Sequence, residues 1–400
     1  MSWLLDNATL LHQPGLCRLH VQSGGVTIDS GGAPLAADEY WDLEGRLVLP
    51  AFAELHTHLD KTYAPVNNAD GGLWGAIEAF REYKAVRSDV DVEQAAERAL
   101  RKAISEGVTR LRSHVNAASS EDLELVAVLD ALRRRYAPAI DVQLVAMGVF
   151  GAEEERHIAA CIDAGADMIG GAPALQAEPH EAVRRAVALA TEHDVPLDLH
   201  IDEHLESGLC TLATLAEEVL RVGFPHAVTA GHCASLAVLA PDERATLLAR
   251  VREARISIVA LPVCNLVLLG GSTRPYLRGT APVSELVEAG VNVCLGSDNV
   301  RDPFNPFGGY APLKNLQISN MLERHNSDAA IRDSLPLITD NAHEAFDGKP
   351  VPSGDLVVLD ATDLLDALCD PAPCLATFKS GRRVYARRLE ETFDCGHAAL

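Results

Sequence analysis

The sequence predicts an α/β protein: a (β/α)8 TIM-like barrel with a small β-sandwich domain built from both chain ends. Three observations favour this architecture. From residue 47 onward, short apolar runs alternate with helix-length amphipathic segments, as in the strand–helix units of a parallel sheet. These units number eight over about 300 residues, which matches the size of such a barrel. Both chain ends instead carry short β-like runs separated by turn residues.

The apolar runs are the predicted barrel strands, and they occupy residues 47–52 (LVLPAF), 109–115, 141–148, 168–175, 196–203, 228–234, 257–263 and 292–298. Between them lie Ala-rich segments such as VEQAAERALRKAISEG, which are charged on one face and are good helix formers. A doubly wound open sheet is the alternative, but no G-x-G-x-x-G motif opens a helix. We therefore expect a catalytic barrel over residues 47–349, with its active site at the C-terminal ends of the strands.

The two chain ends are expected to form one further domain. Residues 1–46 contain the β-like runs LLDNATLL and CRLHVQSGGVTI, and residues 350–400 contain GDLVVLDA and CLATFKSGRRVYARRL. Either end is too short to bury a core of its own. The sequence therefore predicts a discontinuous β-sandwich domain of residues 1–46 plus 350–400.

The composition limits the kinds of partner. The chain has 57 acidic and 34 basic residues, a formal charge of -23, and this excess repels nucleic-acid phosphates and anionic lipids. No apolar run reaches the roughly 18 residues of a membrane span, and the first residues lack a secretory signal. Nine cysteines without a C-x-x-C pair indicate reduced thiols. We expect a cytoplasmic enzyme with a small-molecule substrate and no nucleic-acid or membrane partner; a homo-oligomer stays open.

Candidate metal ligands follow several of the predicted strands. In ELHTHLD, His56 and His58 are two residues apart, so in a strand they face the same way. One such pair is often a chance occurrence. His200, His232 and Asp298, however, follow three other apolar runs, and the ends of all these strands meet at the mouth of a barrel. This convergence predicts a metal site.

The residue types explain the chemistry. Three imidazoles and a carboxylate can hold one divalent cation and leave a position for water, whose pKa the cation lowers so that hydroxide becomes available. Asp298 would bind the metal weakly and take the proton of that water. Glu203, in HIDEH, is placed to carry a proton to a ring nitrogen and later to leaving ammonia. No lysine lies between Lys102 and Lys314 to bridge a second metal, which predicts a mononuclear site.

Four short motifs, HTH (56–58), HIDE (200–203), GHC (231–233) and GSD (296–298), resemble those of the amidohydrolase superfamily. The resemblance is to its mononuclear deaminase branch, and within it to the bacterial cytosine deaminases. It extends to LPVCNLVLLGG and to RGTAPVSELVEAGVNVCLGSDNVRDPFNPFG, and it covers nearly the whole chain.

The resemblance implies roles for individual residues. Glu203 would shuttle protons to the ring, and His232 would polarise the attacked centre or orient the hydroxide. One Fe2+ or Zn2+ ion would be bound by His56, His58, His200 and Asp298.

Three further residues are expected to contact the substrate. Phe304 falls where the family packs a tryptophan on the substrate. Val149 replaces a glutamine that reads the pyrimidine edge, and Asn299 replaces a second aspartate. An apolar wall at Val149 favours a ring with an extra apolar group. The predicted function is therefore a hydrolytic deaminase that releases ammonia from a cytosine-like pyrimidine, of the cytosine or 5-methylcytosine type, by attack of metal-bound hydroxide.

Other functions fit the sequence less well. The SDNVRD run is also similar to enzymes that remove alkylamines from s-triazines of the N-alkyl ammelide type, but those lack the glutamate that Glu203 supplies. Creatinine and other cyclic amidines are further alternatives. Motifs of serine hydrolases, P-loop enzymes and zincins are absent. A catalytically silent barrel kept as a binding module would have lost a ligand, and none is lost here.

Overall fold

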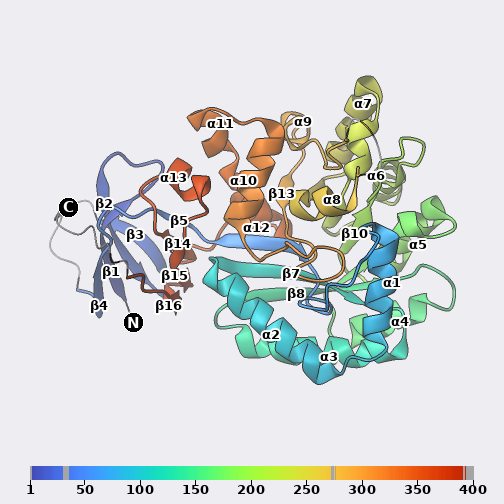
Figure 1. Cartoon of the computed structure of the whole chain (residues 1–400), viewed down its shortest axis with the longest axis horizontal. Helices are drawn as coiled ribbons and strands as arrows, with labels where there is room; N and C mark the ends of the chain where they lie inside the picture. Colours follow the sequence, from blue (N-terminus) through green and yellow to red (C-terminus); the bar gives the residue numbers. More distant parts are fainter. Residues whose placement is uncertain (1, 30–35, 272–273, 275, 391, 393–400) are drawn as a thin grey trace.

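The computed structural model describes residues 2–29, 36–271, 274, 276–390 and 392. Figure 1 shows a small domain of strands on the left and a larger domain, in which helices surround strands, on the right. Among the described residues, no helix combines the length and the apolar character needed to cross a membrane.

The larger domain is a parallel barrel, as predicted. In the described part of the chain its eight strands pair in sequence order, and they are β6 (Phe52–Thr57), β7 (Val108–Asn116), β8 (Asp141–Gly148), β9 (Met168–Gly171), β10 (Leu197–Ile201), β11 (Val228–His232), β12 (Ile256–Ala260) and β13 (Val293–Leu295). The backbone N–H of Asp298 donates to the carbonyl oxygen of His56 at 2.7 Å. This bond joins the chain after β13 to the end of β6 and closes the barrel.

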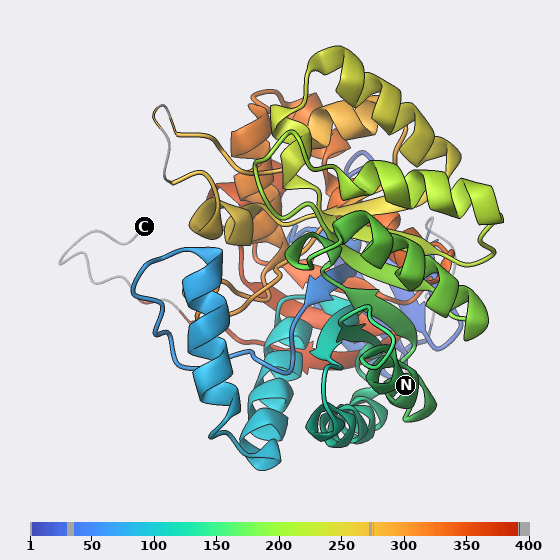
Figure 2. The same ribbon diagram turned by 90° about the vertical axis from the view of Figure 1, so that its right-hand side faces the viewer.

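Helices cover the outside of the strands, as Figure 2 shows. Local sequence favours the start of these helices. In α2, for example, Ser88 and Asp91 form a capping box just before Val92, the first buried residue of the helix. The helices between β6 and β13 are α1 (Leu73–Lys84), α2 (Asp89–Ser105), α3 (Ser120–Tyr136), α4 (Glu155–Asp163), α5 (Pro179–Glu192), α6 (Thr211–Val222), α7 (Pro241–Glu253), α8 (Pro262–Leu268) and α9 (Val283–Glu288), with 3-10 turns η1 (Pro173–Leu175) and η2 (Ala234–Val238). After β13 follow α10 (Pro312–Glu323), α11 (Asp328–Asp333), η3 (Leu335–Ile338) and α12 (Asp340–Asp347).

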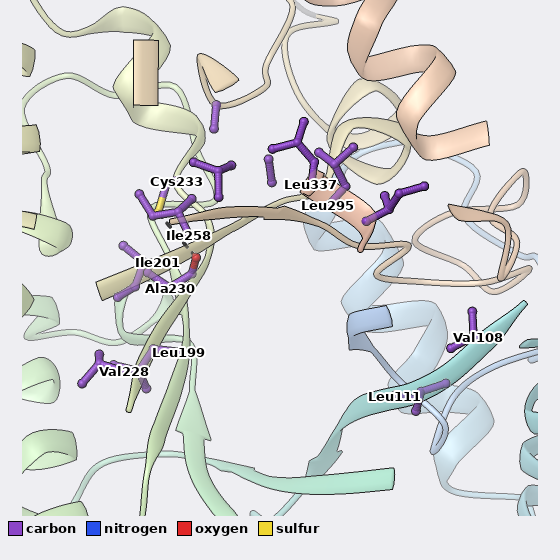
Figure 3. Packing of buried hydrophobic residues seen from close by; sticks show 14 of the residues in the cluster. Val108, Leu111, Leu199, Ile201, Val228, Ala230, Cys233, Ile258, Leu295 and Leu337 are labelled. Carbon is purple, nitrogen blue, oxygen red and sulfur yellow. Dashed lines mark hydrogen bonds between the residues drawn. The ribbon is translucent and has the colours of Figure 1, made fainter. Parts of the chain in front are cut away.

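Alternation along the strands separates the core from the barrel interior. Leu199 and Ile201 of β10 belong to the large buried cluster that includes residues of the surrounding helices, and Figure 3 shows them beside Val228 and Ala230 of β11. The alternate residue His200 instead faces side chains from other strands inside the barrel. The period of two therefore delivers every second side chain to the interior.

A buried arginine organises the interior below the strand ends. Arg112 of β7 is fully buried, and it donates to Gln143 Oε1 at 2.9 Å and to Asp198 Oδ2 at 2.8 Å. It also donates to the carbonyl oxygen of Ala345 in α12 at 2.8 Å. One guanidinium thus links three strands to the helix packed against β6 and β13.

The small domain is a sandwich of two sheets drawn from both chain ends, as predicted. A T-shaped contact between Trp3 and Phe378, with ring centroids 5.9 Å apart, lies in the core between them. One sheet has the order β3-β2-β1-β4, with β1 (Trp3–Thr9), β2 (Leu16–Gln22), β3 (Gly25–Asp29) and β4 (Glu39–Asp42). The other has the order β16-β15-β14-β5, with β5 (Val48–Pro50), β14 (Leu356–Leu359), β15 (Cys374–Lys379) and β16 (Arg382–Ala386), and α13 (Leu364–Cys369) follows β14.

One predicted strand was wrong. The apolar run 47–52 is not a single barrel strand, because β5 pairs with β14 in the small domain and the barrel strand β6 begins only at Phe52. Both strands are buried on two sides, so hydrophobicity gives no sign of the break between them. The predicted domain limits stay predictions, since strand pairing does not define where an independently folding unit ends.

Candidate metal centre

The predicted metal ligands meet at one end of the barrel. His56 lies in β6, His58 directly after it, His200 in β10, and Asp298 three residues after β13. The Nε2 atom of His200 is 3.2 Å from that of His56 and 3.3 Å from that of His58. Asp298 Oδ1 lies 3.0 Å from His58 Nε2. The structure thus brings these side chains together; their assignment as the ligand set stays a prediction.

The protonation states suit a divalent cation. Burial lowers the pKa of His58 to about 4 and those of His56 and His200 well below their usual value, so the imidazoles are neutral. Burial alone would raise the pKa of Asp298, but the adjacent imidazoles of His58 and His232 lower it, so the carboxylate stays ionised. Neutral imidazoles and ionised carboxylates are the metal-binding forms.

A wider set of atoms converges on the same point. Ligand-type atoms of His56, His200, His232 and Asp298 all lie within 4.8 Å of one another, and these residues are buried. Neither carboxylate oxygen of Asp298 has a hydrogen-bond partner within the described structure. Because buried polar atoms are normally satisfied, this donor set fits one bound divalent metal ion.

His232 ends β11 in a strained conformation. Its backbone φ is +66°, and that of Asp298 is +57°, both in the left-handed region that non-glycine residues seldom adopt. Asn265 Nδ2 donates to His232 Nδ1 at 3.0 Å. Burial lowers the pKa of His232 to about 4, so the ring is neutral and carries its proton on Nε2. His232 is therefore arranged to donate a hydrogen bond from Nε2, which lies 3.9 Å from Asp298 Oδ2.

Glu203 lies two residues after β10, with its Oε1 atom 3.7 Å from His232 Nδ1. Burial and the charge of Asp298 raise the pKa of Glu203 well above its usual value, and the opposing charge of Lys61 limits the rise. A carboxyl group with a raised pKa can both give and take a proton near neutral pH.

A cavity of about 430 Å³ opens above these residues. His58, His200, Glu203, His232 and Asp298 line it, and so do all three predicted substrate contacts, Val149, Asn299 and Phe304.

The three predicted substrate contacts differ in their exposure and in the residues around them. Val149 is 42% exposed. Asn299 is buried, and its amide donates to Asp302 at 2.7 Å. Phe304 packs near Phe80 of α1, with ring centroids 6.4 Å apart. The cavity thus has one apolar aromatic wall, formed partly by a helix that the sequence did not associate with the site.

Sequence reasoning missed several residues of the site. Glu54 accepts a hydrogen bond from the backbone N–H of His56 at 3.2 Å. It shares the period-two spacing of His56 and His58, so the same alternation, extended one step back, would have indicated it. Lys61 comes after the strand has ended, where no periodic signal applies, yet it lines the cavity together with Asn116 and Gln176.

Several known proteins are similar to this chain. A pterin deaminase from Rhizobium rhizogenes is 33% identical over 283 residues, which cover 68% of this chain and 64% of that protein. The chain thus spans less than two thirds of the length of this relative.

Two solved structures match over nearly the whole chain. The 5-methylcytosine deaminase from Klebsiella pneumoniae bound to phosphonocytosine superposes with a TM-score of 0.89 and 26% identity, covering 98% of this chain and 100% of that one. The N-isopropylammelide isopropylaminohydrolase from Burkholderia multivorans superposes with a TM-score of 0.83 and 27% identity, covering 96% and 98%.

The family assignment rests on a sequence model of the family. The sequence model of the amidohydrolase family matches residues 68–385, which is more than half of the chain. The chain therefore belongs to the amidohydrolase family, as its motifs predict.

Proposed function

We propose that the protein is a metal-dependent hydrolytic deaminase that releases ammonia from a cytosine-like pyrimidine, of the cytosine or 5-methylcytosine type. The observation that carries this proposal is that Glu203, His232 and Asp298 line one cavity beside the candidate metal ligands. The similarity to 5-methylcytosine deaminase over 98% of the chain supports the choice of ring.

Each residue has a distinct part in the proposed reaction. A bound Fe2+ or Zn2+ ion, held by His56, His58, His200 and Asp298, would lower the pKa of a water molecule and supply the nucleophile. The Asp298 carboxylate accepts the proton of the attacking water, and His232 Nε2–H donates a hydrogen bond to its oxygen. Glu203 gives its proton to the ring nitrogen, takes the proton of the added hydroxyl as that C–O bond becomes a carbonyl, and passes it to the amino group, which leaves as ammonia. Transfer of the proton held by Asp298 back to Glu203 restores both carboxyl groups.

A pterin-type bicyclic ring is the second candidate substrate. The cavity volume of about 430 Å³ falls in the range that holds ligands larger than one pyrimidine ring. The 33% identity to a pterin deaminase supports the same class. An N-alkyl ammelide is the third candidate, on the similarity to the isopropylammelide enzyme.

The test is release of ammonia or amine by the purified protein reconstituted separately with iron and with zinc. The panel contains cytosine, 5-methylcytosine, isoguanine, creatinine, pterin and N-isopropylammelide. We expect ammonia from a pyrimidine with either metal. Ammonia release from pterin alone would show that the second candidate, a pterin-type ring, is the substrate. Isopropylamine from the ammelide, with no ammonia from any ring, would overturn the proposed deamination.

A further inference from the structure

One face of α1, the blue helix beside the barrel in Figure 2, lines the cavity. The cavity-lining residues of this helix recur at spacings of three and four positions, which places them on one side. In order along the helix they are Leu73, Ile77, Phe80, Arg81 and Lys84. The helix thus presents first an apolar stretch and then two cations to the cavity.

Lys61 lies in the same cavity, closer to the metal centre. Its side chain is only 6% exposed, and its ammonium lies 5.0 Å from the ring centroid of Phe80 and 5.3 Å from that of Phe304. In the described part of the chain no carboxylate oxygen lies within 4.0 Å of Lys61 Nζ. Two aromatic faces stabilise a cation only partly, so this ammonium is suited to an anionic ligand.

The distribution of charge in the cavity differs from that of the whole chain. The protein has 57 acidic and 34 basic residues. Glu203 and Asp298 are the acidic residues among those lining the cavity, and both belong to the metal centre. The other charged lining residues, Lys61, Arg81 and Lys84, are cationic. The charged side chains that line the cavity outside the metal centre are therefore all cationic, in an otherwise acidic protein.

The ion pairs of the two outer cations leave them able to bind a ligand. Arg81 contacts Glu78 at 2.8 Å, but both side chains are mostly exposed, so water screens the pair and holds Arg81 only weakly. Lys84 contacts Asp122 Oδ1 at 2.5 Å. An ammonium has three N–H donors, so this contact leaves others free.

We propose that Lys61, Arg81 and Lys84 bind a carboxylate carried on a substituent of the heterocyclic substrate. This inference rests on the proposed function, because the ring itself is the part that is deaminated at the metal centre. The apolar face of α1 packs against the substituent, and Arg81 supplies the planar pair of donors that matches a carboxylate. The three cations thus select for substrates that carry a negative charge outside the ring.

The experiment compares matched substrates on the metal-reconstituted enzyme. The pairs are 5-methylcytosine with 5-carboxycytosine, and pterin with pterin-6-carboxylate. For at least one pair we expect kcat/KM of the carboxylated compound to exceed that of the uncharged one by about tenfold or more. A ratio at or below one for both pairs would overturn the inference.

Variants test whether Arg81 and Lys84 cause the preference for carboxylated substrates. In the double variant Arg81→Gln, Lys84→Gln we expect the ratio of carboxylated to uncharged kcat/KM to fall about tenfold, chiefly through KM of the carboxylated compound. Arg81→Lys, Lys84→Arg should keep most of the ratio because both charges remain. The matched control is Arg134→Gln, at an exposed arginine of α3 that pairs with Asp130 and does not line the cavity. A ratio that is unchanged in the double variant, with thermal unfolding showing a folded protein, would refute the assignment.

The two proposals fail in different ways. If neither compound of either pair yields ammonia, and the panel of parent rings is also inactive, the proposed function fails. If the parent rings are deaminated but the carboxylated compounds have no higher kcat/KM, the proposed deaminase function is supported and only the proposed carboxylate-binding site is refuted.

Discussion

Ser297 donates both its hydroxyl and its backbone N–H to the carboxylate of Glu54, at 2.5 Å and 2.9 Å. The same carboxylate accepts the backbone N–H of His56 at 3.2 Å. Burial raises the pKa of Glu54 to about 7, and the hydrogen bonds from Ser297 and His56 counteract this rise. One buried carboxylate thus links the first barrel strand to the residue just before Asp298, behind the metal centre.

Replacing Glu54 by Gln should weaken the metal centre. The NH2 group of glutamine would face the donors of Ser297 and His56, which now bond to carboxylate oxygens of Glu54. Losing these hydrogen bonds frees the backbone of His56 and of the segment that carries Asp298, so both side chains lose their fixed orientation. We expect metal affinity or turnover to fall about 10- to 100-fold, the usual effect of removing a group that orients ligands. Metal content after dialysis and kcat measure this. The matched control is Glu78→Gln, an exposed residue of α1, and equal values for both variants would contradict the linkage.

Replacing Glu203 by Gln should abolish proton transfer without removing the metal. The amide keeps the size and polarity of the side chain but cannot carry a proton, so we expect turnover to fall by several orders of magnitude. Metal content should equal that of the wild type. Glu206→Gln, three positions along in an exposed stretch, is the control. Turnover of Glu203→Gln within tenfold of the wild type would contradict the proposed role.

The sequence predicts the barrel and the polar residues at its strand ends because both follow from simple periods. Alternation along β6 and β10 places His56 and His200 inside the barrel whatever surrounds them. No such rule brings α1 to the cavity, because its position depends on contacts such as that between Phe80 and Phe304, which are 224 positions apart. The break between β5 and β6 is hidden for a related reason, since burial on both sides removes the alternation that would reveal it.

Removing the metal should lower both activity and stability. The candidate ligands come from strands far apart in the sequence, so a bound ion stabilises the folded chain and not the unfolded one. A ligand present at about 100 times its Kd adds about 2.7 kcal/mol to the free energy of unfolding. We expect a chelator to abolish turnover and lower Tm, and added zinc or iron to restore both. A chelated protein with unchanged Tm and unchanged activity would rule out a metal centre.

Arg112 should be required for stability. It is fully buried and paired with Asp198, which is also fully buried, at 2.8 Å. In Arg112→Met the Asp198 carboxylate keeps its burial but loses the paired charge, which typically costs about 3–5 kcal/mol. The double variant Arg112→Met, Asp198→Asn removes the unpaired charge as well, so we expect it to recover part of the loss. Urea denaturation measures both, and a single variant as stable as the wild type would contradict this account.

His343 of α12 makes folding sensitive to acid. The ring is buried, and its Nε2 donates to the carbonyl oxygen of Ala51 at 3.0 Å. Burial, aided by the charge of Arg110, lowers its pKa from 6.5 to about 4. As the pH falls below 6.5 the unfolded chain takes up a proton that the folded protein does not, so the free energy of unfolding decreases. The decrease continues down to about pH 4, and it amounts to about 3 kcal/mol at 1.36 kcal/mol per pH unit.

His343→Gln isolates this effect because glutamine can still donate to Ala51 but does not titrate. Other buried histidines also destabilise the fold in acid, so the informative quantity is the difference between variant and wild type at two pH values. Between pH 7.5 and pH 5 we expect the variant to lose about 2 kcal/mol less than the wild type, measured by urea denaturation. Equal losses would mean that the His343 ring gains no proton affinity on unfolding, and other buried titratable groups would then account for the acid sensitivity.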